Sequence, residues 1–86
     1  MKTYQEIVGE LIAVIHALTP EVKALDENTE LIGNLGLDSM KVMNLIQEVE
    51  DRFDVSIPLN VLPDVRTIGD LALKIHLLLQ SHDSAR

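Results

Sequence analysis

The apolar residues of the first part of the chain recur at helical intervals. Thr3 and Glu6 have the spacing of a capping box, a pattern that marks the start of a helix. Pro20 stands just past the last apolar position of the segment, and proline does not continue a helix. We therefore predict a helix that ends before Pro20 and buries a face made of Ile7, Val8, Leu11, Ile12, Ile15 and Leu18.

A second amphipathic pattern occupies the middle of the chain. Its later apolar positions follow the first by three, four, seven and eleven residues, so all of them share one helical face. This face consists of Val42, Leu45, Ile46, Val49 and Phe53. We predict that this face is core. Asp38 and Ser39 both stand where an N-cap residue is expected, and the pattern leaves the choice between them open.

The last helical pattern is introduced by Thr67 and Asp70, again at capping-box spacing with Asp in place of Glu. Its apolar face is made of Ile68, Leu71, Ala72, Ile75, Leu78 and Leu79. Before it, residues 54–58 are expected to be extended because Pro58 keeps its predecessor out of helical geometry. A short helix is predicted at about residues 59–62, ended by Pro63.

These elements predict an all-α fold, namely a small four-helix bundle of three long helices and one short helix. A chain of 86 residues is long enough for one domain with one core. We expect the domain to cover residues 1–80, followed by a polar C-terminal tail at 81–86. The connection at 20–38 is long for a compact domain. Its apolar residues predict an ordered loop fastened to the core through Leu31, Ile32, Leu35 and Leu37.

Composition narrows the possible partners. Hydrophobic residues make up 47% of the chain and aromatic residues 2%, so few rings are available to stack on nucleic-acid bases. The formal net charge of -7 repels phosphate backbones and anionic membranes, and it favours partners with basic patches. There is no cysteine, no signal-peptide pattern and no apolar run of the roughly 20 residues that a membrane span needs. We expect a soluble, cytoplasmic monomer that binds no nucleic acid and does not insert into membranes.

One serine stands out by its position. The run Gly36-Leu37-Asp38-Ser39-Met40 places Ser39 at the predicted start of the second helix, after a loop that contains glycine. The first N–H groups of a helix have no partner within the helix and the helix dipole is positive there. A phosphate ester on Ser39 is therefore favoured electrostatically. Simple capping of the helix by Asp38 or Ser39 is the alternative explanation.

The run from Leu35 to Met40 resembles the G-x-D-S-[LM] attachment motif of acyl, aminoacyl and peptidyl carrier proteins. The resemblance extends from about Ile7 to Leu79 and includes the order of the helices and a phenylalanine, Phe53, at the end of the second one. It implies the acyl-carrier type of bundle. It also implies that a phosphopantetheinyl transferase, using coenzyme A and magnesium, attaches 4'-phosphopantetheine to the Ser39 hydroxyl.

The resemblance further implies roles for the neighbours of Ser39. Asp38 is expected to orient the serine and the magnesium in the transferase complex, and Gly36 to let the loop approach closely. The expected partners are the transferase, a ligase or transferase that loads an acyl or aminoacyl group, and downstream biosynthetic enzymes. Their expected docking surface is formed by Met40, Lys41, Met43, Asn44, Gln47 and Glu48.

The cargo stays open at this point. Lys41 resembles peptidyl or polyketide carriers, whereas three acidic residues resemble the fatty-acid type, namely Glu48, Glu50 and Asp51. We interpret the chain as a stand-alone carrier of acyl, aminoacyl or polyketide thioesters in fatty-acid or secondary-metabolite biosynthesis. The alternative is a helical protein–protein interaction module that shares the carrier fold and is not modified.

Other kinds of site have weaker support. Ser39 is followed by no glycine of a G-x-S-x-G elbow, and the three histidines lie on the first and last helices or in the tail, so we do not expect an enzyme. The acidic stretch Asp26, Glu27 and Glu30 lacks the alternating ligands of a calcium loop, so no metal site is expected. The glycines Gly33 and Gly36 are not followed by the Gly-Lys-Ser/Thr of a phosphate-binding loop.

Overall fold

The structure is a computed structural model that describes residues 3–20 and 24–84; for residues 59, 61, 62 and 81–84 it describes the backbone alone. Within this part of the chain there are three α-helices, one 3-10 helix and no β-strand, so the all-α prediction is confirmed. Residues 21–23 of the predicted loop and 85–86 of the predicted tail lie outside the described residues.

Helix α1 spans Tyr4–Leu18 and begins with the predicted capping box. The Glu6 N–H donates to Thr3 Oγ1 over 3.2 Å, and the Thr3 N–H donates to Glu6 Oε1 over 2.9 Å. At the other end the Thr19 hydroxyl, which is buried, donates to the carbonyl of Ile15 over 2.9 Å. Side chains thus satisfy two backbone donors at the start of the helix, and a backbone carbonyl accepts from the buried Thr19 hydroxyl at its end.

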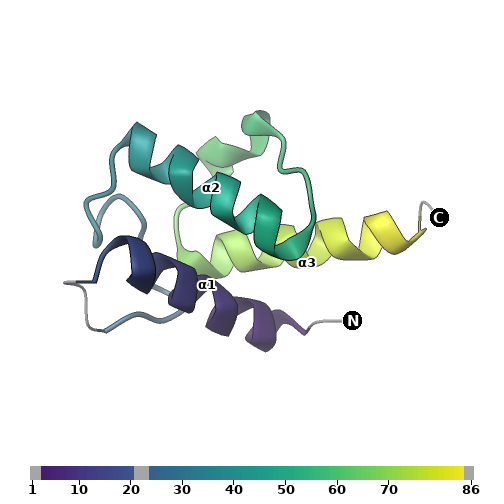
Figure 1. The fold of residues 1–86 in the computed structure, drawn as a ribbon, viewed down its shortest axis with the longest axis horizontal. Coiled ribbons are helices and arrows are strands. Elements are labelled where there is room, and N and C mark those ends of the chain that lie inside the picture. The colour runs from purple at the N-terminus through teal and green to yellow at the C-terminus, as the bar shows by residue number, and fades with distance from the viewer. Residues whose placement is uncertain (1–2, 21–23, 85–86) are drawn as a thin grey trace.

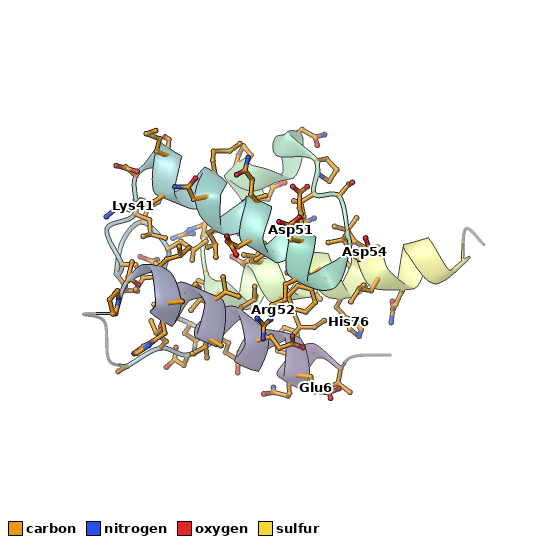
Figure 2. The ribbon with its side chains drawn as sticks, in the orientation of Figure 1. Glu6, Lys41, Asp51, Arg52, Asp54 and His76 are labelled. Atoms are coloured by element: carbon orange, nitrogen blue, oxygen red, sulfur yellow. The ribbon has the colours of Figure 1, made fainter. Side chains whose placement is uncertain are left out.

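Helix α2 spans Ser39–Phe53, with Asp38 as its N-cap and Asp54 as its C-cap. Asp54 has a φ of 56°, the left-handed conformation in which many helices end. After α2 the Glu50 carboxylate accepts a hydrogen bond from the Ile57 N–H over 2.7 Å, which holds the connector against the helix it has just left. Arg52 of α2, labelled in Figure 2, forms an ion pair with Glu10 of α1. The distance between Arg52 Nε and Glu10 Oε1 is 3.0 Å.

The short fourth element differs from the predicted helix in its type and in its end. The segment Leu59–Asp64, η1, is a 3-10 helix, and Pro63 lies inside it instead of ending it. Proline has no backbone N–H to donate within a helix, and η1 ends one residue later, at Asp64. The observed architecture is three α-helices with one 3-10 connector.

Helix α3 spans Ile68–Ser84. Its predicted capping box is present, because the Asp70 N–H donates to Thr67 Oγ1 over 3.0 Å and the Thr67 N–H donates to Asp70 Oδ2 over 3.2 Å. At its other end the helix extends past Gln80, to Ser84. The division into a domain at 1–80 and a tail at 81–86 stays a prediction.

Helix α1 contacts both α2 and α3, and Figure 1 shows α3 crossing behind the other two helices. The core between them consists of aliphatic side chains and one ring, as the composition requires. Its buried apolar members are Ile7, Val8, Leu11, Val14, Ile15, Leu31, Leu37, Leu45, Ile46, Val49, Phe53, Ile57, Ile68, Leu71, Ala72 and Ile75.

Two side chains that we expected in the core are at the surface. Leu18 is exposed at the last turn of α1, and Ile32 of the loop is 68% exposed. Leu31 and Leu37 are buried as predicted, while Leu35 is partly buried against the core. The loop therefore is fastened to the core through Leu31 and Leu37, and it turns Ile32 outward.

The loop that precedes α2 is also bonded to the start of α3. Glu30 forms an isolated antiparallel bridge with Thr67, and the Leu31 N–H donates to the carbonyl of Arg66 over 2.9 Å. The N–H groups of Ile68 and Gly69, which open α3, donate to loop carbonyls of Thr29 and Glu27 over 3.0 and 2.8 Å. Backbone groups of the loop thus replace the partners that the first residues of a helix lack.

Candidate functional site

The serine predicted to carry the chemistry is the first residue of α2 and is exposed. The capping alternative is decided by its neighbour, because Asp38 Oδ1 accepts the N–H of Lys41 over 2.9 Å. Within the described residues no hydrogen bond occupies the Ser39 hydroxyl. Asp38 therefore caps the helix, and the exposed Ser39 hydroxyl is not used in capping.

The electrostatics at this helix end favour an anion. The first turn of α2 contains no acidic residue, and the unpaired N–H groups and the dipole of a helix both favour negative charge at its N-terminus. Asp38 already uses one of these N–H groups, that of Lys41. A phosphate ester on Ser39 would lie beside the remaining positive end of the helix.

The loop reaches Ser39 through a tight turn at Gly36. Its φ is 68°, in the left-handed region that favours glycine, and its N–H donates to the carbonyl of Ile32 over 3.0 Å. A Cβ atom at Gly36 would meet no other atom within 4 Å. The backbone conformation therefore favours glycine here, and the role of Gly36 in a close approach of the loop to the transferase stays a prediction.

Further back, the same loop is held by the first residue of α1. Tyr4 Oη donates to Glu27 Oε1 over 2.8 Å. This hydrogen bond is the main cause that raises the pKa of Tyr4 above its usual 10.0, followed by partial burial and by the negative charges of Glu27 and Asp70. The segment that leads to Ser39 is therefore fixed to both α1 and α3.

All six residues of the predicted docking surface belong to α2 and are exposed. They divide between two flanks of the helix. Met43 lines a groove together with Ser39, whereas Lys41 and Asn44 line a smaller hollow of about 160 Å³ between α1 and α2. Figure 2 shows Lys41 at the loop end of α2, pointing away from the bundle. The exposed set is Met40, Lys41, Met43, Asn44, Gln47 and Glu48.

The groove beside Ser39 has a volume of about 310 Å³ and mostly apolar walls. Three segments form it: the loop, α2, and the region from the end of η1 to the start of α3. Sequence reasoning did not assemble it, because its members are far apart in the chain and share no period. They are Leu31, Ile32, Ser39, Val42, Met43, Ile46, Pro63 and Val65.

The acidic residues and the histidine considered above for a metal site or an enzyme site do not come together around Ser39. Asp26 accepts from the Asn28 N–H over 2.8 Å, and Glu30 pairs with Arg66 over 3.3 Å. Among the described residues no group of three or more potential metal ligands is present. Figure 2 shows His76 on α3, far along the molecule from Lys41 and the N-terminus of α2. No helix of the described part of the chain is both long and apolar enough to cross a membrane.

Comparison with known families agrees with this geometry. The sequence model of the family described as "Phosphopantetheine attachment site" matches residues 5–75, which include all of α2 and the loop before it. The chain belongs to this carrier family. Members of the family are carriers and not catalysts, which fits the prediction that the chain is not an enzyme.

Relatives of this carrier have consistent names. A "Probable acyl carrier protein" of Caulobacter vibrioides is 51% identical over 43 residues, which are 50% of this chain and 50% of that protein. An acyl carrier protein of Rhodococcus erythropolis is 27% identical over 88% of this chain and 85% of its own length. The meromycolate extension acyl carrier protein of Mycolicibacterium smegmatis is 27% identical over 96% of this chain and 85% of its own length.

A solved structure has the same fold as this carrier. It is described as that of "a putative acyl carrier protein" from Mycobacterium tuberculosis, and it superposes with a TM-score of 0.77 at 28% identity, over 83% of this chain and 96% of the other. The structural agreement confirms the all-helical carrier fold.

The family's cofactor is a covalently attached 4'-phosphopantetheine. The residues at the start of α2 fit this group. Ser39 offers an exposed side chain, and the helix N-terminus favours the phosphate charge. The arm supplies a terminal thiol on which cargo is held as a thioester.

Proposed function

We propose that this chain carries acyl intermediates as thioesters on a 4'-phosphopantetheine arm attached to Ser39, and that it passes them between biosynthetic enzymes. The observation that carries the proposal is that two adjacent residues have different roles at the start of α2. Asp38 caps the helix, and Ser39 is left exposed at the positive end of the helix dipole. The names of the relatives favour an acyl group over an aminoacyl or polyketide group as cargo.

The expected partners follow from the same position. A phosphopantetheinyl transferase must reach Ser39, and Asp38 beside it is suited to hold a magnesium ion with its second carboxylate oxygen. A loading ligase or acyltransferase and the downstream enzymes must reach the end of the arm. The six residues that we assigned to docking are all exposed on α2, the helix that begins with Ser39. We expect the carrier to act as a monomer in the cytoplasm.

The proposal is tested by intact-mass measurement after incubation with coenzyme A, magnesium and a broad-specificity phosphopantetheinyl transferase. The parent protein should gain the mass of one phosphopantetheinyl group, and Ser39→Ala should stay at its unmodified mass. Because Asp38 provides the cap, Ser39→Ala should keep the helical circular dichroism of the parent.

Ser56→Ala is the matched control, since Ser56 is an exposed serine outside the helices. This variant should be modified like the parent. Modification of Ser39→Ala, or a parent that several transferases leave unmodified, would contradict the proposal. The second result would instead favour an interaction module that shares the fold without the arm.

A further inference from the structure

Helix α3 exposes two leucines that the core does not use. Leu73 is 49% exposed and Leu77 is 47% exposed, whereas Leu78 and Leu79 of the same helix are partly buried against the core. Residues four apart are neighbours on one side of a helix, so Leu73 and Leu77 form one apolar stripe. Single exposed leucines are common, but a pair at this spacing is typical of helices that pack against a helical partner.

The stripe continues into a hollow at the start of α3. This hollow has a volume of about 400 Å³, and its lining includes Leu73, Tyr4, Glu27 and Asp70. Two hydrogen bonds hold its walls together. Tyr4 Oη donates to Glu27 Oε1 over 2.8 Å, and the Gly69 N–H donates to the Glu27 carbonyl oxygen over 2.8 Å. We call the leucine pair together with this hollow the α3 face.

The hollow has a negative charge. Its lining within the described residues contains the carboxylates of Glu27 and Asp70 and no Lys, Arg or His side chain. Both carboxylates accept from uncharged donors, namely the Tyr4 hydroxyl and the N–H groups of Arg66 and Thr67, which leave their charge in place. After the hydrogen bond to Glu27 and partial burial, the charges of Glu27 and Asp70 also raise the pKa of Tyr4. A cationic group is therefore favoured in the hollow.

The leucine stripe has basic neighbours further along α3. Lys74 and His76 are half-buried, and by the helical period they lie on opposite sides of the stripe. A partner that covers the α3 face therefore needs its basic side chain at the hollow and not beside Leu77. This unequal distribution of charge favours one direction of the partner along α3.

We propose that the α3 face binds an amphipathic helix of a partner protein, which packs apolar side chains on Leu73 and Leu77 and places a Lys or Arg side chain in the hollow. Figure 1 shows that the C-terminal part of α3 extends beyond the ends of α1 and α2, so a helix can be laid along it without displacing either. A second copy of this chain is disfavoured as the occupant, because each copy has a formal net charge of -7.

The α3 face is separate from the site of modification. Its hollow shares no lining residue with the groove that contains Ser39. One protein can therefore hold the carrier through α3 while an enzyme acts at Ser39. This inference goes beyond the proposed function and does not depend on it.

The test uses the full chain and a fluorescently labelled helical peptide, with leucines four residues apart and two lysines at one end of the leucine stripe. Anisotropy gives the Kd of the peptide. We expect the Kd to rise about tenfold in Leu73→Ser, and to rise in Glu27→Gln most strongly at low salt. Leu18→Ser is the matched control, because Leu18 is 43% exposed at the end of α1, outside the α3 face, and this variant should bind like the parent. Circular dichroism checks that each variant is folded.

A peptide with glutamates in place of the lysines should bind more weakly than the lysine peptide by about tenfold or more. Equal Kd values for Leu73→Ser and Leu18→Ser, or no binding of the lysine peptide, would overturn the inference. Backbone amide shifts that change around Ser39 instead of along α3 would do the same. Self-association of the parent that Leu73→Ser abolishes would assign the face to a second copy and also overturn it. Ser39→Ala should bind the peptide like the parent, so a failure here is distinct from a failure of the proposed function.

Discussion

The backbone N–H of Gly69 donates to the carbonyl oxygen of Glu27 over 2.8 Å, and this bond ties the second residue of α3 to the loop that leads to Ser39. The two backbones come so close that no side chain fits between them. A Cβ atom on Gly69 would lie 2.8 Å from Tyr4 Oη and 2.9 Å from the Glu27 carbonyl oxygen. Tyr4, Glu27 and Gly69 thus form one junction of α1, the loop and α3.

Gly69→Ala should destabilise the protein by about 1–3 kcal/mol, because the backbone of Glu27 cannot move away as a flexible side chain could. Gly9→Ala is the control, since Gly9 lies inside α1 and a Cβ atom there meets nothing within 4 Å. That variant should gain about 0.5–1 kcal/mol from helix propensity. The urea midpoints of the two variants, compared with that of the parent, test this. A higher midpoint in both variants would show that the junction has room for a side chain at Gly69.

Leu45→Ala should cost about 2–5 kcal/mol of unfolding free energy, because Leu45 is fully buried on the inner face of α2. Small domains have a total stability of about 5–15 kcal/mol, so this loss is enough to unfold a measurable fraction of the protein. Gln47→Ala, on the exposed face of the same helix, should change the denaturant midpoint little. Similar shifts in the two variants would mean that α2 faces the core differently.

The pH dependence of stability should include a contribution from Tyr4. Its pKa is raised in the folded state because its hydroxyl donates to the Glu27 carboxylate, so folding favours the protonated phenol. This contribution is fully present below the unfolded pKa of about 10 and is lost as the pH rises through the folded value. Glu27→Gln should lower the folded pKa of Tyr4.

Tyr4 is the single tyrosine and there is no tryptophan, so ultraviolet absorbance of the phenolate follows this one group. The titration midpoint should lie above 10 in the native protein and near 10 in denaturant. Equal midpoints in the two states would contradict the hydrogen bond between Tyr4 and Glu27.

Lys41→Glu should change partner choice without changing stability. Lys41 is exposed at the loop end of α2, and exposed charges affect association rates far more than the stability of the fold. The melting temperature should stay close to that of the parent, whereas loading by the native ligase or acyltransferase should slow. Exchange with fatty-acid-synthase enzymes, which are expected to prefer an acidic surface, should improve. Loading rates measured at low and high salt check this, and identical rates would show that Lys41 selects no partner.

Local sequence patterns predicted the helices well because helix starts depend on residues close in the chain. The capping boxes at Thr3 and Thr67 lie where the spacing of Thr with Glu6 and Asp70 placed them. The core face of α2 follows the helical period, and all of its predicted residues but Val42, which is partly buried, are buried.

Prediction failed where contacts join distant segments. An irregular loop has no period, so the sequence could not tell that Leu31 faces the core while Ile32 faces solvent. The bridge between Glu30 and Thr67 and the groove beside Ser39 depend on the packing of the loop against α3 and η1. The position of Ser39 at a helix start was predictable, and the surroundings that a partner meets were not.

The bridge between Glu30 and Thr67 has a consequence for the order of events during protein synthesis. The loop before Ser39 takes its backbone partners from Arg66, Thr67 and the first residues of α3, which leave the ribosome much later than the serine does. A nascent chain that ends before these residues lacks the bonds that fix the loop, and small domains fold as complete units. The loop that leads to Ser39 therefore reaches its final conformation only after residues 66–69 have been synthesised.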